Sequence, residues 1–258
     1  MITHNHRSKK NARELVYGIN AVMATLETTP ESIISAYVLK GKEDKRLNEI
    51  ISLLKGLNVA IQHSSRSYLD ERSDGGVHQG IMIEVKATPK LCEKDLDTIL
   101  EGEDKPLVLI LDGVTDPRNL GACMRSAWAA GAKAVVVPKD KSAGFTPSAR
   151  KAASGAANNL PLIYVTNLSR TITHLQDDFN FRVIGMAGEA RDDIYTTDLT
   201  GALAIVMGSE DTGLRRLTRE RCDDVTKIPM ADGVESLNVS VAAGIALFEA
   251  RRQRLINL

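Results

Sequence analysis

The sequence contains few cysteines and none of the spacings that mark a metal site or a disulfide framework. Cys92, Cys123 and Cys222 lie far apart in 258 residues, with no CxxC pair or Cys/His cluster. This usage is typical of a reduced, intracellular protein and predicts no metal. The sequence also has no run of about 18 apolar residues and no signal-peptide pattern, so we expect neither membrane insertion nor secretion. We therefore expect a cytoplasmic protein.

An excess of one charge sign is missing as well. The 33 Lys and Arg residues balance the 33 Asp and Glu residues, so net charge does not indicate an anionic partner. Basic residues nevertheless cluster in the first thirteen residues and in segments 215–221 and 251–254. Each cluster by itself fits a solvated surface as well as a nucleic-acid contact.

Three common active-site signatures are also absent. Without GxGxxG or GxxxxGK[ST], a dinucleotide or nucleoside-triphosphate site lacks its usual mechanism, which disfavours a nucleotide-dependent oxidoreductase. Without a GxSxG elbow, the usual hydrolase site is disfavoured.

Hydrophobic patterning divides the chain into two blocks. Residues 1–11 form a basic tail that we expect to be flexible, and residues 88–105 form a polar, charged linker with room for a short helix. The first block, residues 12–87, alternates helices and strands and predicts a small α/β domain. Its expected elements are helices over 12–27, 44–57 and 65–74, and strands over 35–40, 58–65 and the end of 75–87.

The second block, residues 106–258, predicts a larger α/β domain with a mostly parallel sheet. Short apolar runs alternate with helical segments, and a long helix over 237–255 ends the pattern. Such runs are typical of strands that are buried on both faces. The expected strands lie within 106–114, 132–138, 160–165, 181–188, 202–210 and 225–230.

Three of these strands are followed by polar segments, and ligands bind at the carboxyl ends of strands in open parallel sheets. The segments are "DGVTDPRNLGACMRSA" (112–127), "GSEDTGL" (208–214) and "IPMADGVESLNVSVAAG" (228–244), and no histidine lies near them. Taken singly, each has a structural alternative. Glu210 could cap the next helix, Asn238 could be a turn residue, and Arg125 could pair with a buried carboxylate.

The first of these segments predicts a helix with an open arginine face. Asp116 and Pro117 are typical of a helix start, and an apolar stripe follows at helical spacing. Arg118 and Arg125 share the opposite face with small residues, which allow close approach by a ligand or by a second subunit. These small residues are Gly121, Ala122 and Ala129.

Three sequence segments together resemble the motifs of the SpoU-type RNA ribose 2′-O-methyltransferases of the SPOUT superfamily. They are "DPRNLGACMRSAWAAGAKAVVV", "AIVMGSEDTGL" and "IPMADGVESLNVSVAAGIALFEA", in that order. The first block resembles the small, ribosomal-protein-like RNA-binding domain of some members. Its "YGINAV" (17–22) and "HQGI" (78–81) are similar to the subgroup that methylates a guanosine in 23S rRNA.

This resemblance implies a parallel-sheet SPOUT domain with a deep C-terminal trefoil knot, in a homodimer. It also implies that S-adenosylmethionine is bound by the knotted loops, through Met207, Gly208, Ile228, Pro229, Leu237 and Asn238. By position, Arg125 matches the family's catalytic arginine. The other matching polar positions are Asn119, Glu210, Ser236 and Asn238.

A protonated guanidinium has no lone pair to accept a proton, so Arg125 is expected to bind the RNA phosphate and the forming alkoxide instead. Arg118 and Arg66 are further candidate RNA contacts, together with the glycine-rich turn at 75–80. Two alternatives stay open: a tRNA ribose 2′-O-methyltransferase, and a non-catalytic RNA-binding or ribosome-assembly protein of the same fold.

Overall fold

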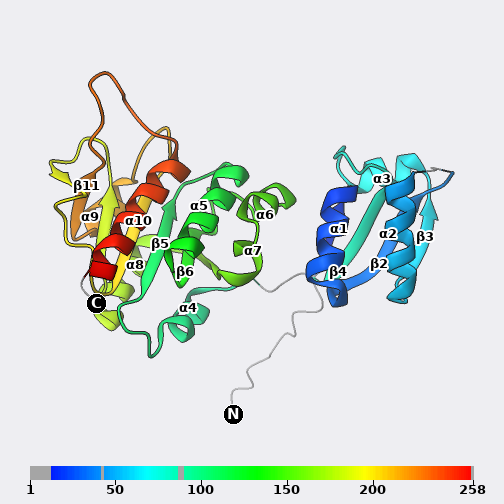
Figure 1. Cartoon of the computed structure of the whole chain (residues 1–258), viewed down its shortest axis with the longest axis horizontal. Helices are drawn as coiled ribbons and strands as arrows, with labels where there is room; N and C mark the ends of the chain where they lie inside the picture. Colours follow the sequence, from blue (N-terminus) through cyan, green and yellow to red (C-terminus); the bar gives the residue numbers. More distant parts are fainter. Residues whose placement is uncertain (1–12, 42–43, 87–89, 257–258) are drawn as a thin grey trace, which may run out of the picture. The chain divides into compact units, whose positions relative to one another are not determined.

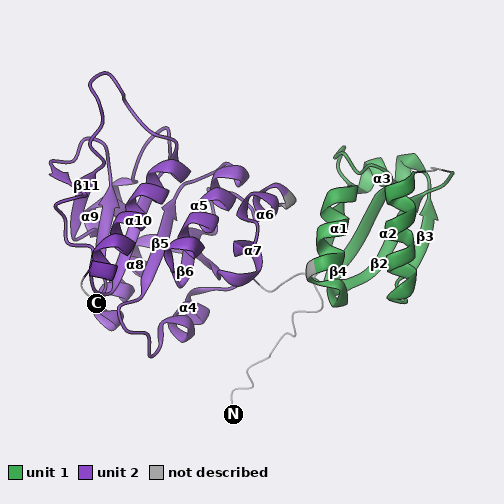
Figure 2. Cartoon of the chain, viewed as in Figure 1, with its two compact units in different colours: residues 1–89 green, residues 90–258 purple. Residues whose placement is uncertain are grey.

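The computed structural model describes residues 13–41, 44–86 and 90–256, within two units that span residues 1–89 and 90–258 (Figure 2). The tail expected over residues 1–11 lies outside the described residues. Unit 2 begins at Lys90 and therefore includes most of residues 88–105, which we expected to form a linker. Its helix α4 (Glu93–Leu100) buries Leu96 and Leu100 in the core of unit 2.

Unit 1 is built on a four-stranded mixed sheet in the order β1-β4-β2-β3 (Figure 1). β2 and β3 pair in parallel, whereas β4 pairs antiparallel with both β1 and β2. The apolar side chains of α1 and α2 form the main core against one face of the sheet, and Leu69 of α3 packs on the other. The elements are β1 (Arg13–Tyr17), α1 (Ile19–Thr28), β2 (Ile33–Leu39), α2 (Lys45–Gly56), β3 (Ala60–Ser64), α3 (Arg66–Arg72) and β4 (Ile81–Lys86).

The single helix expected over residues 12–27 is wrong, because its first third is strand β1. Residues 13–17 pair with β4 in antiparallel register, and the chain turns into α1 at Gly18, whose φ of 90° favours glycine. Gly18 also donates its N–H to the Ile81 carbonyl at 3.1 Å. The partner strand lies more than 60 residues away, so local periodicity does not reveal it.

Unit 2 contains a seven-stranded sheet in the order β7-β6-β5-β10-β8-β11-β9, and every pair in it is parallel (Figure 1). The predicted α/β class and parallel sheet are confirmed. The strands are β5 (Leu107–Asp112), β6 (Ala134–Pro138), β7 (Leu162–Val165), β8 (Arg182–Met186), β9 (Asp192–Asp193), β10 (Leu203–Gly208) and β11 (Asp224–Lys227). The two-residue strand β9 was not expected.

Helices cover both faces of this sheet, so its central strands are buried throughout. Side chains of α5, α6 and α10 pack on one face, and those of α4 and α8 on the other. All six residues of β5 are buried. The remaining helices are α5 (Pro117–Ala130), α6 (Pro147–Ala153), α7 (Ala156–Asn159), α8 (Leu168–Phe179), α9 (Arg216–Arg221) and α10 (Val239–Ile256).

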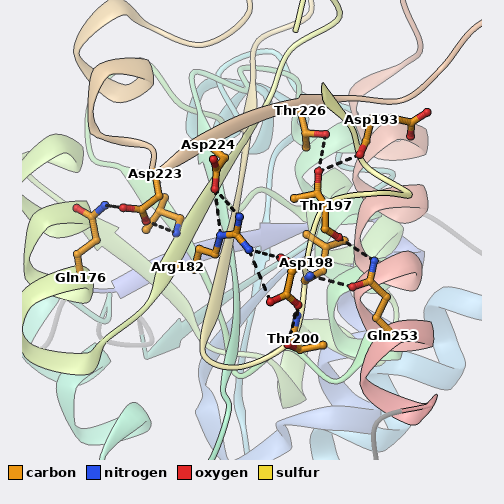
Figure 3. A network of polar contacts seen from close by, with 12 residues as sticks. Gln176, Arg182, Asp193, Thr197, Asp198, Thr200, Asp223, Asp224, Thr226 and Gln253 are labelled. Atoms are coloured by element: carbon orange, nitrogen blue, oxygen red, sulfur yellow. Dashed lines mark hydrogen bonds and ion pairs between the residues drawn. The ribbon is translucent and has the colours of Figure 1, made fainter. Parts of the chain in front are cut away.

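The C-terminal end of α10 is hydrogen-bonded to residues 197–201, which lead into β10 (Figure 3). Gln253 donates to the Thr197 carbonyl at 3.0 Å and accepts from the Leu199 N–H at 2.9 Å. Arg254 donates to the carbonyls of Gly201 at 2.6 Å and Lys105 at 2.9 Å.

The same segment is held from its other side by Arg182, at the start of β8. This guanidinium donates to the Asp198 carbonyl at 2.9 Å and to Asp224 Oδ2 at 2.7 Å (Figure 3). The end of the last helix and the starts of the strands therefore form one polar network. The trefoil knot that the resemblance implies stays a prediction.

Candidate active site

Three chain segments meet at the carboxyl edge of the unit 2 sheet. Strands β5 and β10 are parallel neighbours, with Asp112 opposite Gly208, and they lead into α5 and into the turn over residues 209–214. Strand β11 leads into the loop over residues 228–238, which ends at α10. Because parallel strands end at the same edge, the three polar segments share one side of the sheet.

Hydrogen bonds join Asn119, Glu210 and Asn238, one residue from each segment. Glu210 Oε1 accepts from Asn238 Nδ2 at 2.7 Å and from Asn119 Nδ2 at 3.1 Å. Asn238 Nδ2 also donates to Asn119 Oδ1 at 3.0 Å. The three side chains therefore hold the starts of α5 and α10 and the turn after β10 in one arrangement.

The triad of Asn119, Glu210 and Asn238 also caps the last helix. Glu210 Oε1 accepts the N–H of Val239 at 3.1 Å, and Asn238 Oδ1 accepts the N–H of Ser240 at 3.0 Å. Glu210 thus caps α10 and not the next helix, α9. A carboxylate beside the positive end of a helix dipole is favourable, typically by about 0.3–1 kcal/mol when exposed.

Arg125 lies on the exposed side of α5, about one and two-thirds turns beyond Asn119. Its guanidinium has no hydrogen-bond or ion-pair partner among the residues that the structure describes. The alternative that a buried carboxylate neutralises Arg125 is therefore not observed. Arg118 is exposed on the same side, and its N–H is accepted by the capping Asp116 at 2.8 Å.

Gly121 is small because another helix of the same chain packs against it. A Cβ built on Gly121 would lie 2.2 Å from the Ala149 carbonyl oxygen and 2.7 Å from the Ala152 Cβ, both on α6. Glycine is required here because α6 crosses α5 at this point. Of the three small residues, only Ala129 is exposed.

The residues predicted to bind the cofactor lie at the end of β10 and in the loop over residues 228–238. A Cβ on Gly208 would meet Gly213 at 2.1 Å, because Ser209 and Gly213 exchange backbone hydrogen bonds of 3.1 and 3.0 Å. The other residues predicted to bind the cofactor range from buried to exposed: Met207 is buried, Ile228 and Leu237 are half-buried, and Pro229 and Asn238 are exposed. Ser236, one of the polar positions that match the family, is exposed as well.

The loop over residues 228–238 leaves main-chain groups open to a ligand. Between described residues of this loop, the one internal backbone hydrogen bond joins the Val234 N–H to the Ala231 carbonyl at 3.2 Å. Exposed N–H and C=O groups beside half-buried Ile228 and Leu237 suit a ligand with both polar edges and an apolar face.

Asp112 and Arg215 are further polar residues at this edge that the sequence analysis did not identify. Asp112 is fully buried, and its Oδ2 accepts the Arg215 N–H at 2.9 Å. In the sequence, the feature that could have identified Asp112 is its position as an acidic residue at the end of an apolar run. Nearby, burial and, secondarily, the charge of Glu210 raise the pKa of the Cys123 thiol to about 12. That thiol stays protonated and is no nucleophile at neutral pH.

In unit 1, Arg66 begins α3 and is 81% exposed, 3.8 Å from Asp70. The neighbouring turn at 75–80 is held by side chains. His78 bonds to Asp70 Oδ1 at 2.9 Å, and Gln79 Oε1 accepts the Ile19 N–H at 2.9 Å. Val77, directly before these two residues, is 80% exposed, so the turn presents an apolar side chain to solvent.

Within the described ranges, no group of three or more His, Cys, Asp or Glu residues is arranged to hold a metal ion. No helix in that part of the chain is long and apolar enough to cross a membrane.

Comparison with known proteins assigns a family to each unit. Residues 106–248 match the SpoU rRNA Methylase family, and residues 15–91 match the family described as RNA 2'-O ribose methyltransferase substrate binding. The first match covers most of unit 2, including Asn119, Arg125, Glu210 and Asn238.

Similar proteins cover nearly the whole chain. The 23S rRNA (guanosine-2'-O-)-methyltransferases RlmB of Haemophilus influenzae and Escherichia coli K12 are 57% and 56% identical, over 94% and 93% of this chain and 98% and 99% of their own lengths.

Among solved structures, the SpoU methyltransferase AviRb of Streptomyces viridochromogenes, crystallised with AdoMet, has the same fold. It aligns with a TM-score of 0.70 at 24% identity, over 95% of this chain and 91% of its own. An RNA 2'-O ribose methyltransferase aligns with a TM-score of 0.67 at 26% identity, over 94% and 89%. The chain therefore belongs to the SpoU rRNA methylase family.

Proposed function

We propose that this protein transfers a methyl group from S-adenosylmethionine to the ribose 2′-hydroxyl of a guanosine in 23S rRNA. The observation that carries the proposal is the hydrogen-bonded triad of Asn119, Glu210 and Asn238. Asn119 belongs to the same helix, α5, as the exposed Arg125, which has no hydrogen-bond or ion-pair partner among the described residues. Identity of 56–57% to RlmB proteins supports the choice of substrate. The proposed substrate places the protein in the cytoplasm.

The cofactor would be held by Met207, Gly208, Ile228, Pro229, Leu237 and Asn238, at the edge that the triad organises. The open main-chain groups of the 228–238 loop suit the polar edge of an adenine, and Ile228 and Leu237 suit its faces. When bound, S-adenosylmethionine supplies an electrophilic methyl group on a sulfonium. The protein's task is to position the ribose in line with it.

Arg125 would bind the phosphate beside the target ribose and stabilise the negative charge that develops on its 2′-oxygen. Its exposed guanidinium, to which no described residue is bonded, has donors for both oxygens. Asn119, Glu210 and Asn238 would fix the loops around it, with Ser236 and Arg118 as further contacts. The group that takes the 2′-hydroxyl proton is left open.

Unit 1 would recognise the RNA, in keeping with its match to a substrate-binding family. Arg66 and the turn at 75–80, with its exposed Val77, are its proposed contacts. Proteins usually read RNA sequence at unpaired loops, where bases are accessible to such side chains.

We further propose a homodimer that covers the outer face of α10. Val241 and Phe248, seven residues apart, are 50% and 48% exposed there, and Leu255 is 57% exposed. An apolar stripe of this kind needs a partner surface. Phe248→Glu should shift the sedimentation coefficient to that of a monomer. Leu53→Glu, at a site 45% exposed in unit 1, should not.

The direct test is incubation with labelled S-adenosylmethionine and unmodified total RNA, followed by mapping of 2′-O-methyl groups. We expect label at one guanosine of 23S rRNA. Label in tRNA would support the tRNA alternative, and binding of rRNA without any label would support a non-catalytic assembly protein.

A further inference from the structure

Arg215 forms an ion pair with a buried carboxylate at the candidate active site. Its backbone N–H donates to Asp112 Oδ2 at 2.9 Å, and its Nε lies 3.4 Å from Asp112 Oδ1. Asp112 is fully buried, whereas the Arg215 side chain is 41% exposed. A buried carboxylate thus accepts the backbone N–H of Arg215 and forms an ion pair with its side chain, which is partly open to solvent.

The guanidinium lies beside the segments predicted to bind the reactants. A Cβ built on Gly113 would lie 3.4 Å from Arg215 Nη2 and 3.8 Å from the Ser209 Cβ. Arg215 Nη2 is also 3.5 Å from the carbonyl of Lys141, in the loop after β6. Arg215 therefore occupies the junction of three strand ends, next to the turn that contains Glu210.

The neighbouring arginines pair with exposed acidic residues. Arg216 pairs with Glu220, and Arg219 pairs with Glu189, so both have exposed partners that neutralise their charge. Arg215 instead pairs with the buried Asp112. The Nη1 of Arg215 makes no hydrogen bond to any residue in the described ranges. Lys139 and Lys141 add exposed positive charge nearby.

We propose that Arg215 binds a backbone phosphate of the RNA substrate, as a second cationic contact besides Arg125. Preorientation by Asp112 lowers the entropy lost when the remaining donors engage phosphate oxygens. The inference rests on the proposed function, because it takes RNA as the substrate.

Arg215→Ala tests the inference, with Arg216→Ala as the matched control, because that residue is adjacent in sequence, basic and exposed. For Arg215→Ala we expect about a tenfold higher Kd for a 23S rRNA fragment, and a salt dependence of log K lowered by about one. KM for RNA should rise while kcat changes little. Arg216→Ala and the affinity for S-adenosylmethionine should stay near wild type.

Unchanged RNA affinity and salt dependence in Arg215→Ala would overturn the inference. So would a loss confined to S-adenosylmethionine binding, which would assign the guanidinium to the cofactor's carboxylate. If the melting temperature falls, Arg215→Lys provides the second variant, since it keeps the charge and the N–H to Asp112. RNA affinity should then recover at least in part, and no recovery would indicate a structural role. Wild-type protein that binds no rRNA would refute the proposed function itself.

Discussion

Asn238 and Glu210, 28 residues apart, are joined by a hydrogen bond of 2.7 Å at the start of the last helix. The same Glu210 oxygen accepts the Val239 N–H at 3.1 Å. The turn after β10 and the start of α10 therefore hold each other in place, so the loop predicted to bind the cofactor depends on one exposed carboxylate.

Glu210→Ala should destabilise the protein by about 1–2 kcal/mol, because a helix cap and its hydrogen bonds are lost. It should also reduce methyl transfer, since Asn119 and Asn238 lose their common acceptor. Urea unfolding and transfer of labelled methyl groups measure the two effects. Asp211→Ala, at the next exposed position, is the control. Equal stability of the two variants would refute the capping role.

Arg125→Ala should lower kcat by roughly 10²–10³-fold, in the range seen when one donor to a developing oxyanion is removed. Calorimetry should find S-adenosylmethionine affinity close to that of the wild type. Arg170→Ala, on the opposite face of the sheet, controls for the loss of a positive charge. Full turnover by Arg125→Ala would remove this residue from the mechanism.

Gly121→Ala should destabilise unit 2 by about 1–3 kcal/mol or more, as expected when a methyl group is forced into a packed contact. The new Cβ would lie 2.2 Å from the Ala149 carbonyl oxygen, which belongs to backbone and has little room to move. Gly144→Ala is the control, because its Cβ meets nothing closer than 3.7 Å. Similar melting temperatures for the two variants would contradict close packing of α5 on α6.

His174 should make stability depend on pH. Its Nε2 lies 2.6 Å from Asp97 Oδ1 and its Nδ1 lies 2.5 Å from Asp178 Oδ2, so both ring nitrogens donate. The hydrogen bond to Asp97, and then that to Asp178, raise the pKa of His174 above its ordinary 6.5. The stabilisation is therefore complete below the unfolded pKa and is lost as pH rises through the folded pKa.

The corresponding test compares His174→Gln with the wild type by urea unfolding at a pH of about 5.5 and again well above the folded pKa. The wild type should be the more stable protein at the lower pH, and the difference should shrink at the higher pH. His63→Gln, on the exposed strand β3, is the control. A difference that grows with pH would refute a charged His174.

The sequence predicted unit 2 well because its strands are continuous apolar runs and because α5 starts at a recognisable cap. Asp116 indeed caps α5, where its Oδ1 accepts the Arg118 N–H at 2.8 Å. Prediction failed where a distant partner decides the structure. Strand β1 needs β4, and Gly121 needs α6. Motif comparison identified Asn119, Glu210 and Asn238, but their mutual bonds depend on three strand ends that only the fold brings together.

Arg254 links the last turn of α10 to the carbonyls of Lys105 and Gly201, just before β5 and β10, while the first turn of the same helix caps the site. One helix therefore spans the sheet from the starts of β5 and β10 to the edge that carries the site, so a shift of α10 along its axis would disturb both edges of the sheet together.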